Sequence, residues 1–131
     1  MHMKFISFGS GSSGNCYYLG TDNEDVNYGI LIDAGISVNN VKKFLKETDI
    51  PINSIYAVII THDHTDHVKY VTNFGEKLNI PIYATKGVFK GINKNRYIKY
   101  KPSPCCMRYI NKEEPFQIKN FNRIRLIVCA T

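Results

Sequence analysis

The chain has 131 residues, 44% of them hydrophobic, and a formal net charge of +6. This length and composition suit one globular domain and argue against wholesale disorder. A membrane span is not expected, since the sequence contains no apolar run of about 18 residues. The first residues, Met1-His2-Met3-Lys4, do not form a secretory signal, which predicts a cytoplasmic protein.

The charge is divided unevenly along the chain. Residues 1–67 hold 4 Lys and Arg against 8 Asp and Glu, a net charge of −4. Residues 68–131 hold 13 Lys and Arg against 3 Glu, a net charge of +10. A basic half suits a polyanionic partner such as nucleic acid. Solvated lysines on an ordinary surface explain the same charge equally well.

The predicted elements begin with strands and continue with alternating strands and helices. Strands are predicted over residues 3–8, 16–19, 28–33, 55–60, 80–84, 115–119 and 123–129. Helices are predicted over residues 38–47 behind Ser37, over 66–79, and from Thr85 through Lys94. Residues 97–107, which include two prolines, are predicted to be a loop or an edge strand. This order predicts an α/β or α+β fold, in which helices flank a mixed sheet within a single domain over 1–131.

The four cysteines are Cys16, Cys105, Cys106 and Cys129. Without a secretory signal a disulfide framework is disfavoured. The adjacent pair also lacks the Cys-x-x-Cys spacing of a metal site. We therefore predict that all four are structural thiols.

Three of the four histidines, His62, His64 and His67, fall within six positions and are interleaved with Asp63 and Asp66. Imidazole and carboxylate are ligands that Zn²⁺ and related ions prefer. The cluster follows a predicted buried strand and opens a predicted helix, and ligands commonly bind at the carboxyl ends of strands in α/β sheets. We predict two adjacent metals, one held by His62 and His64 and the other by Asp66 and His67. The alternatives to a two-metal site are a solvated loop without a metal and a purely structural zinc site.

The segment from Thr61 to His67 resembles the HxHxDH signature of the metallo-β-lactamase superfamily. The segment Leu31-Ile32-Asp33-Ala34-Gly35 resembles the upstream motif of that superfamily, whose aspartate orients the metal-site loop. The resemblance implies the N-terminal half of an αββα sandwich, with Asp33, Asp66 and His67 as catalytic residues. It implies Zn²⁺, two ions in the complete fold, with Mn²⁺ possible.

The opening from Ser7 to Tyr17 resembles the YycJ- or WalJ-like branch of the superfamily, described as DNA exonucleases. The whole resemblance covers about residues 3–121, and the tail 122–131 is atypical. It implies a phosphodiesterase acting on DNA, with Ser12, Ser13, Gly14 and Asn15 as weaker substrate-binding candidates. Glycines let a backbone approach a ligand closely and form an anion nest, although a simple turn between strands fits as well.

A complete member of the superfamily has a further histidine, a bridging aspartate and another histidine downstream. After His67 this chain contains no histidine and no aspartate. We therefore expect a truncated N-terminal half, broken near Phe121 and inactive alone, or a short protein that completes its site by dimerising. An uncovered sheet would favour oligomers or poor solubility. The rival hypotheses are a non-catalytic metal- or nucleic-acid-binding module and a metallo-hydrolase of small esters or thioesters.

Overall fold

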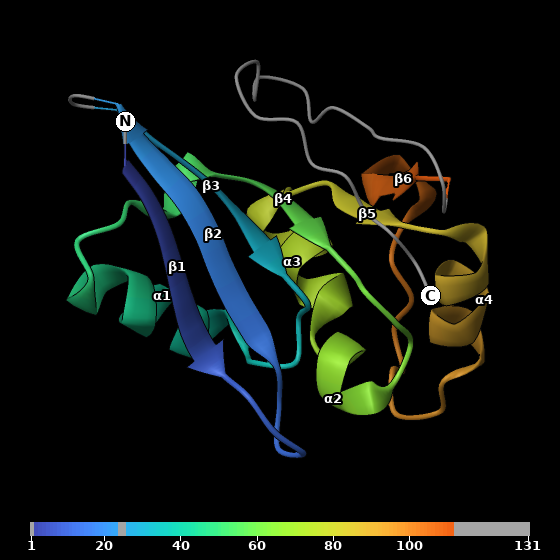
Figure 1. The fold of residues 1–131 in the computed structure, drawn as a ribbon. Helices are drawn as coiled ribbons and strands as arrows, with labels where there is room; N and C mark the ends of the chain where they lie inside the picture. The colour runs from blue at the N-terminus through green and yellow to red at the C-terminus, as the bar shows by residue number, and fades with distance from the viewer. Residues whose placement is uncertain (1, 24–25, 112–131) are drawn as a thin grey trace.

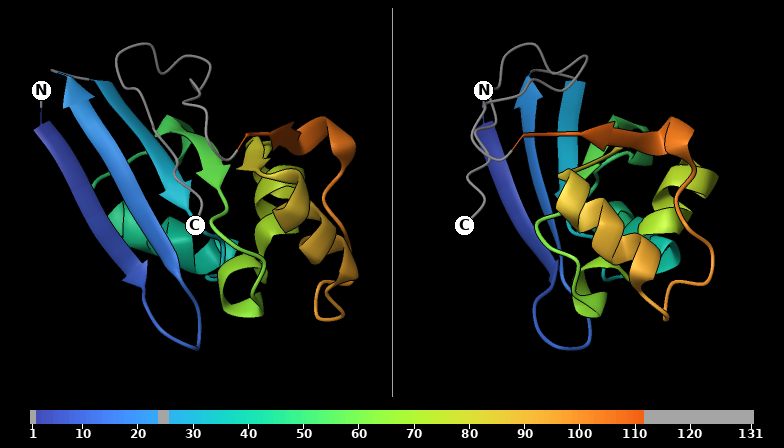
Figure 2. Two further views of the ribbon diagram at one scale, coloured as in Figure 1. Left: turned by 45° about the vertical axis from the view of Figure 1, so that its right-hand side comes forward. Right: turned by 90° about the vertical axis from the view of Figure 1, so that its right-hand side faces the viewer.

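The computed structural model describes residues 2–23 and 26–111, which form a six-stranded sheet with helices on one face (Figures 1 and 2). The strands are β1 (His2–Gly9), β2 (Cys16–Asn23), β3 (Val26–Ile32), β4 (Ile55–Ile59), β5 (Ile82–Ala84) and β6 (Met107–Tyr109). The helices are α1 (Val38–Glu47), α2 (Thr65–Val68), α3 (Val71–Leu78) and α4 (Lys86–Lys94). Short 3₁₀ turns, Ile52–Ser54 and Pro104–Cys106, precede β4 and β6.

The strands lie side by side in chain order, and the sheet is mixed, as the sequence predicts. Strands β1, β2 and β3 pair antiparallel, whereas β3, β4, β5 and β6 pair parallel. Parallel neighbours need crossover connections, and the helices supply them. The second and third strands run further than predicted, because Asp22 pairs with Asn27 and Asn23 with Val26.

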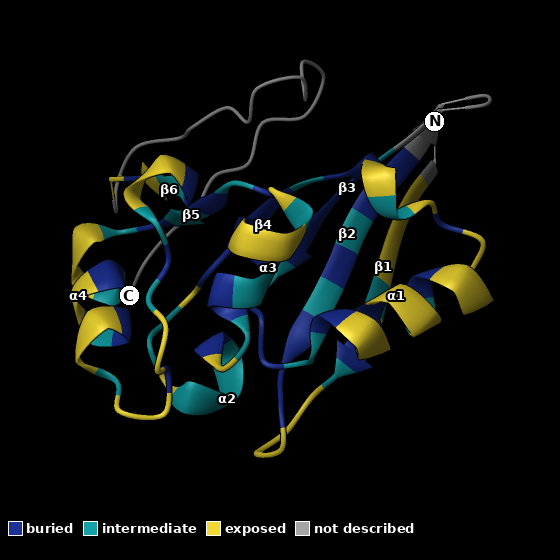
Figure 3. Cartoon of the chain, turned by 180° about the vertical axis from the view of Figure 1, so that it is seen from behind, coloured by how far each residue is buried: buried dark blue, intermediate teal, exposed yellow. Residues whose placement is uncertain are grey.

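The helices bury apolar stripes against the sheet. Ser37 caps α1 by accepting a hydrogen bond from the Asn40 N–H, and Thr85 caps α4 in the same way, both as predicted. Buried side chains face inward from each helix, among them Val41, Phe74 and Ile92, each fully buried. Figure 3 shows the consequence from behind, with exposed residues on the outer sides of α1 and α4. The hydrophobic period of the sequence thus sets which side of each helix faces the sheet.

The single helix predicted over residues 66–79 is wrong, because the structure has two helices separated at Lys69 and Tyr70. In one continuous helix the carbonyls of Asp66 and His67 would accept from the N–H groups four residues later. They accept instead from Asn15 N at 2.8 Å and Ala34 N at 2.7 Å. The Tyr70 N–H donates to Ala34 O at 2.9 Å. Backbone from other parts of the chain therefore takes the hydrogen bonds that would have joined α2 to α3.

The last described strand, β6, lies beside β5 at one end of the sheet and shares only Met107 with residues 97–107, which otherwise form the predicted loop and a 3₁₀ turn. The strands predicted over 115–119 and 123–129, and the atypical tail, lie outside the described residues. At the other end of the sheet β1 carries Met3 and Phe5, which are 62% and 63% exposed. The expected self-association stays a prediction. Among the residues that the structure describes, no helix is long and apolar enough to cross a membrane.

Candidate metal centre

The histidine motif and Asp33 meet at the carboxyl ends of two neighbouring parallel strands. Asp33 follows β3, and its N–H donates to Ile59 O of β4 at 2.8 Å. Its backbone φ is 67°, in the left-handed region, and the residue is only 2% exposed. Aspartate tolerates this region better than most residues do, but the conformation persists only where the surroundings fix it. The fold therefore holds the Asp33 carboxylate at one buried position below the motif.

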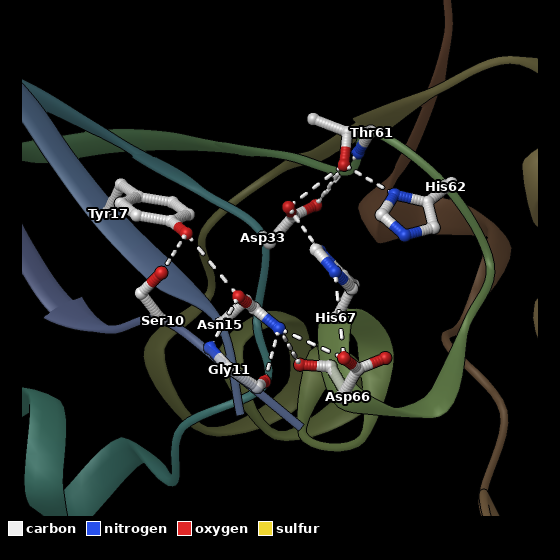
Figure 4. A network of polar contacts seen from close by, with 9 residues as sticks. All are labelled: Ser10, Gly11, Asn15, Tyr17, Asp33, Thr61, His62, Asp66 and His67. Atoms are coloured by element: carbon white, nitrogen blue, oxygen red, sulfur yellow. Dashed lines mark hydrogen bonds and ion pairs between the residues drawn. The ribbon is translucent and has the colours of Figure 1, made fainter. Parts of the chain in front are cut away.

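The Asp33 carboxylate links to two histidines through a short network, drawn in Figure 4. Asp33 Oδ2 accepts from His67 Nδ1 at 2.6 Å, and the Thr61 hydroxyl donates to the same carboxylate at 2.8–2.9 Å. Thr61 Oγ1 also lies 2.9 Å from His62 Nδ1. Because the only hydroxyl proton of Thr61 goes to Asp33, His62 Nδ1 must be the donor in this contact. Both histidines then carry their proton on Nδ1, which leaves each Nε2 free to bind a metal.

Asp33, His62 and His67 each offer a ligand atom, and these atoms lie within 4.8 Å of one another. The Asp33 oxygens already accept hydrogen bonds from Thr61 and His67, so the carboxylate is better placed to orient the histidines than to bind an ion. Burial lowers the pKa of His62, and the neighbouring His67 lowers this pKa further. A lowered pKa favours the neutral imidazole, which is the form that binds metals.

Asp66 and His64 lie at the margins of this group. Asp66 Oδ2 is 3.8 Å from His67 Nε2 and accepts a hydrogen bond from Asn15 Nδ2 at 3.1 Å. His64 is exposed and precedes α2, and its ring centroid is 4.8 Å from that of His62. Of the four predicted metal ligands, His62 and His67 are in closest contact, at 3.7 Å between ring centroids, and only these two belong to the converging group with Asp33.

The glycine-serine loop reaches the motif through Asn15. Asn15 is 6% exposed, and its N–H donates to Asp66 O at 2.8 Å while its side chain holds the Asp66 carboxylate. The N–H groups of Gly11 and Gly14 also donate within the loop, to Asn15 Oδ1 and Gly11 O. These two N–H groups already have acceptors, so fewer backbone donors of the loop are available to an anion than the sequence suggests. Ser12 and Ser13 are exposed, whereas Gly14 is buried.

Gly35 fixes how closely the segment after Asp33 approaches the motif. A Cβ atom placed on Gly35 would overlap the Asp66 carbonyl oxygen and the Asn15 nitrogen. Sequence reasoning gave no role to Gly35 or to Thr61, and it treated Asn15 only as a substrate contact. Thr61 stands directly between a buried strand and the first histidine, which is the one sequence signal that marks it. Nothing in the sequence pattern brings Asn15 to Asp66.

Comparison with known proteins shows which family this chain belongs to. Residues 9–104 match the family model described as "Metallo-beta-lactamase superfamily". The chain belongs to the metallo-beta-lactamase superfamily. Folds of this superfamily bind divalent metals, typically zinc, and its enzymes are metal-dependent hydrolases, so the histidine motif is the expected site for a metal.

The curated relatives are named more specifically than the superfamily, as exodeoxyribonucleases. The chain is 34% identical over 86 residues to "Exodeoxyribonuclease YycJ" of Bacillus anthracis, covering 66% of this chain and 31% of the relative. It is 30% identical over 95 residues to "Exodeoxyribonuclease WalJ" of Streptococcus pneumoniae serotype 2, covering 72% and 34%. The chain therefore spans about one third of the length of these relatives.

A solved metallo-beta-lactamase from Staphylococcus aureus subsp. aureus COL has a similar fold. Its TM-score is 0.65 at 20% identity, over 98% of this chain and 34% of that one. At this identity the likeness concerns the fold alone. It confirms the α/β class and the metallo-beta-lactamase fold predicted from the motif.

Proposed function

We propose that this chain carries the metal-binding part of a phosphodiesterase that degrades DNA as an exonuclease. The observation that carries the proposal is the network of Asp33, Thr61, His62 and His67, which leaves two histidine Nε2 atoms free. The names of the curated relatives support DNA as the substrate. The donor set of imidazoles and one carboxylate suits Zn²⁺, two ions in the complete fold, with Mn²⁺ as a second choice.

Each residue has a distinct part in this proposal. His62, His64, Asp66 and His67 would bind the metal, and Asp33 would keep His62 and His67 in the tautomer that presents Nε2. Asn15 holds the Asp66 carboxylate and the backbone beside it. A bound metal supplies Lewis acidity, which lowers the pKa of a water and stabilises negative charge on the phosphodiester. Of the four loop residues predicted to contact the substrate, Ser12 and Ser13 are the exposed ones.

The proposal further holds that these 131 residues alone do not hydrolyse DNA. After His67 the carboxylates are Glu76, Glu113 and Glu114, with no histidine or aspartate. Glu76 lies on α3, where its carboxylate accepts hydrogen bonds from the Ser103 N–H and hydroxyl. Ligands from outside this stretch, or from a second copy, would then be needed for a complete site.

Calorimetric titration with Zn²⁺ tests the metal part. Replacing His62 or His67 by alanine removes one of the two closest donors, so the affinity should fall by more than about tenfold. His2, the one histidine outside the motif, gives the matched control His2→Ala, which should leave the affinity unchanged. Equal zinc binding in all of these variants would refute a metal centre at the motif.

Product binding tests the substrate class. A site for DNA cleavage should bind thymidine 5′-monophosphate more tightly when Zn²⁺ is present, and by linkage the nucleotide should raise the zinc affinity equally. Acetate, the product of a simple ester, should lack this coupling. The reverse pattern would favour the small-ester hydrolase. Release of nucleotides from labelled DNA by the 131-residue chain would contradict its proposed inactivity alone.

A further inference from the structure

A cleft of about 690 Å³ opens directly beside the histidine motif. Asp63 and Thr65, which alternate with the motif histidines, form one wall of this cleft. Lys94, Arg96 and Tyr97, at the end of α4, stand on the other wall. Figure 1 shows the chain after α4 turning past the level of α2. The cleft thus borders the motif through Asp63 and Thr65, while its lining contains none of the proposed metal ligands.

The motif and α4 are held at a fixed separation. A Cβ atom on Gly91 of α4 would overlap the Asp63 carboxylate, so the bare glycine lets the motif lie against the helix. Asn95 Nδ2 donates to Thr65 Oγ1 at 3.0 Å, which joins the end of α4 to the residue after His64. Both contacts tie the basic wall of the cleft to the residues between the proposed ligands.

The segment after α4 has a fixed backbone but exposed aromatic side chains. The Tyr97 N–H donates to Asn95 Oδ1 at 2.9 Å, and Tyr100 O accepts from the Thr72 hydroxyl at 2.6 Å. Ile98, between the two tyrosines, is buried at 4% exposure. Tyr97 and Tyr100 are nevertheless 78% and 81% exposed. Rings on an anchored backbone lose little conformational entropy when a ligand stacks on them.

The charge of this wall has one sign. From Lys86 to Asn111 the chain holds seven Lys and Arg residues and no Asp or Glu. Lys101 is used internally, since its Nζ donates to Ile92 O and Asn95 O. Lys94 and Arg96 line the cleft, where Asp63 is the only carboxylate among the described lining residues. An anion is therefore drawn toward the α4 wall of the cleft and away from Asp63.

We propose that this cleft binds a single strand of nucleic acid beside the histidine motif, with Lys94 and Arg96 on its phosphates and Tyr97 stacked on a base. The assignment of this strand as a substrate rests on the proposed function, whereas strand binding itself does not. Alternating cations and exposed rings are what a strand with unpaired bases needs. A duplex hides its base faces, so it gains nothing from Tyr97.

Binding of a fluorescein-labelled single-stranded DNA of about 12 nucleotides, a usual site size, tests the proposal by fluorescence anisotropy. EDTA is included, so that the metal centre takes no part. Tyr97→Ala should weaken binding roughly 5-fold to 100-fold, the usual loss for one stacked base, and Tyr97→Phe should retain it. Lys94→Ala with Arg96→Ala should lower the slope of log affinity against log salt by about 1.4, since two phosphate contacts are lost.

The matched control is Lys42→Ala with Lys43→Ala, which removes two exposed lysines from α1, at the other end of the helical layer (Figure 1). This control should leave the slope nearly unchanged. A duplex of equal length should bind more weakly than the single strand and should not respond to Tyr97→Ala. Strand binding is overturned if the control lowers affinity as much as the cleft variants, if Tyr97→Ala has no effect, or if a mononucleotide binds as tightly as the oligonucleotide. Strand binding is measured in EDTA, so it should be the same in His62→Ala, whereas the effect of Zn²⁺ on nucleotide affinity should be lost in that variant. The two measurements therefore test strand binding and the metal centre separately.

Discussion

Two regions border the same site and are built in opposite ways. Around Asp33 and Asn15, polar groups are buried and are hydrogen-bonded to one another and to the histidine motif. Around Tyr97, cations and rings project from an anchored backbone into solvent. In the first region the polar groups are paired with one another, and these hydrogen bonds fix the orientation of the side chains. The second keeps its charged and aromatic groups available.

The difference separates positioning from recognition. Metal ligands need fixed tautomers and orientations, which a buried network supplies. A flexible polymer such as single-stranded DNA is bound by exposed stacking and charge instead. Substitutions in the first region should therefore affect stability or metal affinity, whereas those in the second should affect only binding of the strand.

The largest expected effect comes from Gly35→Ala. The added Cβ would overlap backbone atoms of Asp66 and Asn15, which cannot move aside as a flexible side chain can. The free energy of unfolding should fall by about 3 kcal/mol, the upper end of the usual range for overpacking. Urea denaturation followed by circular dichroism measures it.

Gly87→Ala is the control for this change. The nearest atom to a Cβ on Gly87 is Thr85 Oγ1 at 4.0 Å, and the residue lies in the first turn of α4. Alanine there should stabilise the protein slightly, by up to about 1 kcal/mol. If both variants have the same stability, the close approach of the Asp33 segment to the motif is not a constraint on the fold.

A smaller effect is expected from Asp33→Asn, which keeps the size of the side chain but removes its negative charge. The amide can no longer accept at both positions, so His67 Nδ1 and the Thr61 hydroxyl, which contacts His62, compete for its one acceptor oxygen. Zinc affinity should fall about 10-fold to 100-fold, the usual loss when a residue supporting a ligand is changed. Competition with a chelating dye measures the affinity.

Asp63→Asn is the matched control, because it neutralises a carboxylate between His62 and His64 that lies against Gly91. It should leave zinc affinity unchanged. A loss as large as that of Asp33→Asn would mean that charge near the motif matters and hydrogen bonding does not.

The sequence predicts the site better than it predicts what supports the site. His62, His64, Asp66 and His67 are close in sequence, so one strand end and one turn bring them together, and their chemistry can be read directly. Asp33 is recognisable because the segment around it resembles the upstream motif of the superfamily. Asn15 and Gly35 act on Asp66 from residues far away in the chain, through backbone contacts that no local pattern encodes.

The same reason explains the one wrong helix. Hydrophobic spacing correctly places Val68, Val71 and Phe74 in the core, where all three are fully buried. The spacing does not reveal that carbonyls of Asp66 and His67 bond to Asn15 and Ala34. A tertiary contact therefore ends α2 where local propensity would continue it, and the break lies beside the motif because the contact does.

The smallest effect concerns the rate at which cysteine thiols are alkylated. This rate should differ between a buried thiol beside Asn15 and an exposed thiol elsewhere. Cys16 follows Asn15 in the buried region, and burial, with a smaller contribution from the charge of Asp33, raises its pKa to about 12. At pH 8 only about one such thiol in ten thousand would be ionised, and the thiolate is the form that alkylates. Cys105 is exposed. Iodoacetamide followed by peptide mass spectrometry should therefore modify Cys105 in minutes and spare Cys16, until denaturant exposes it. Rapid labelling of Cys16 in the folded protein would mean that the segment joining the glycine-serine loop to Asp66 opens readily, and the buried network could then not hold the histidine motif in place.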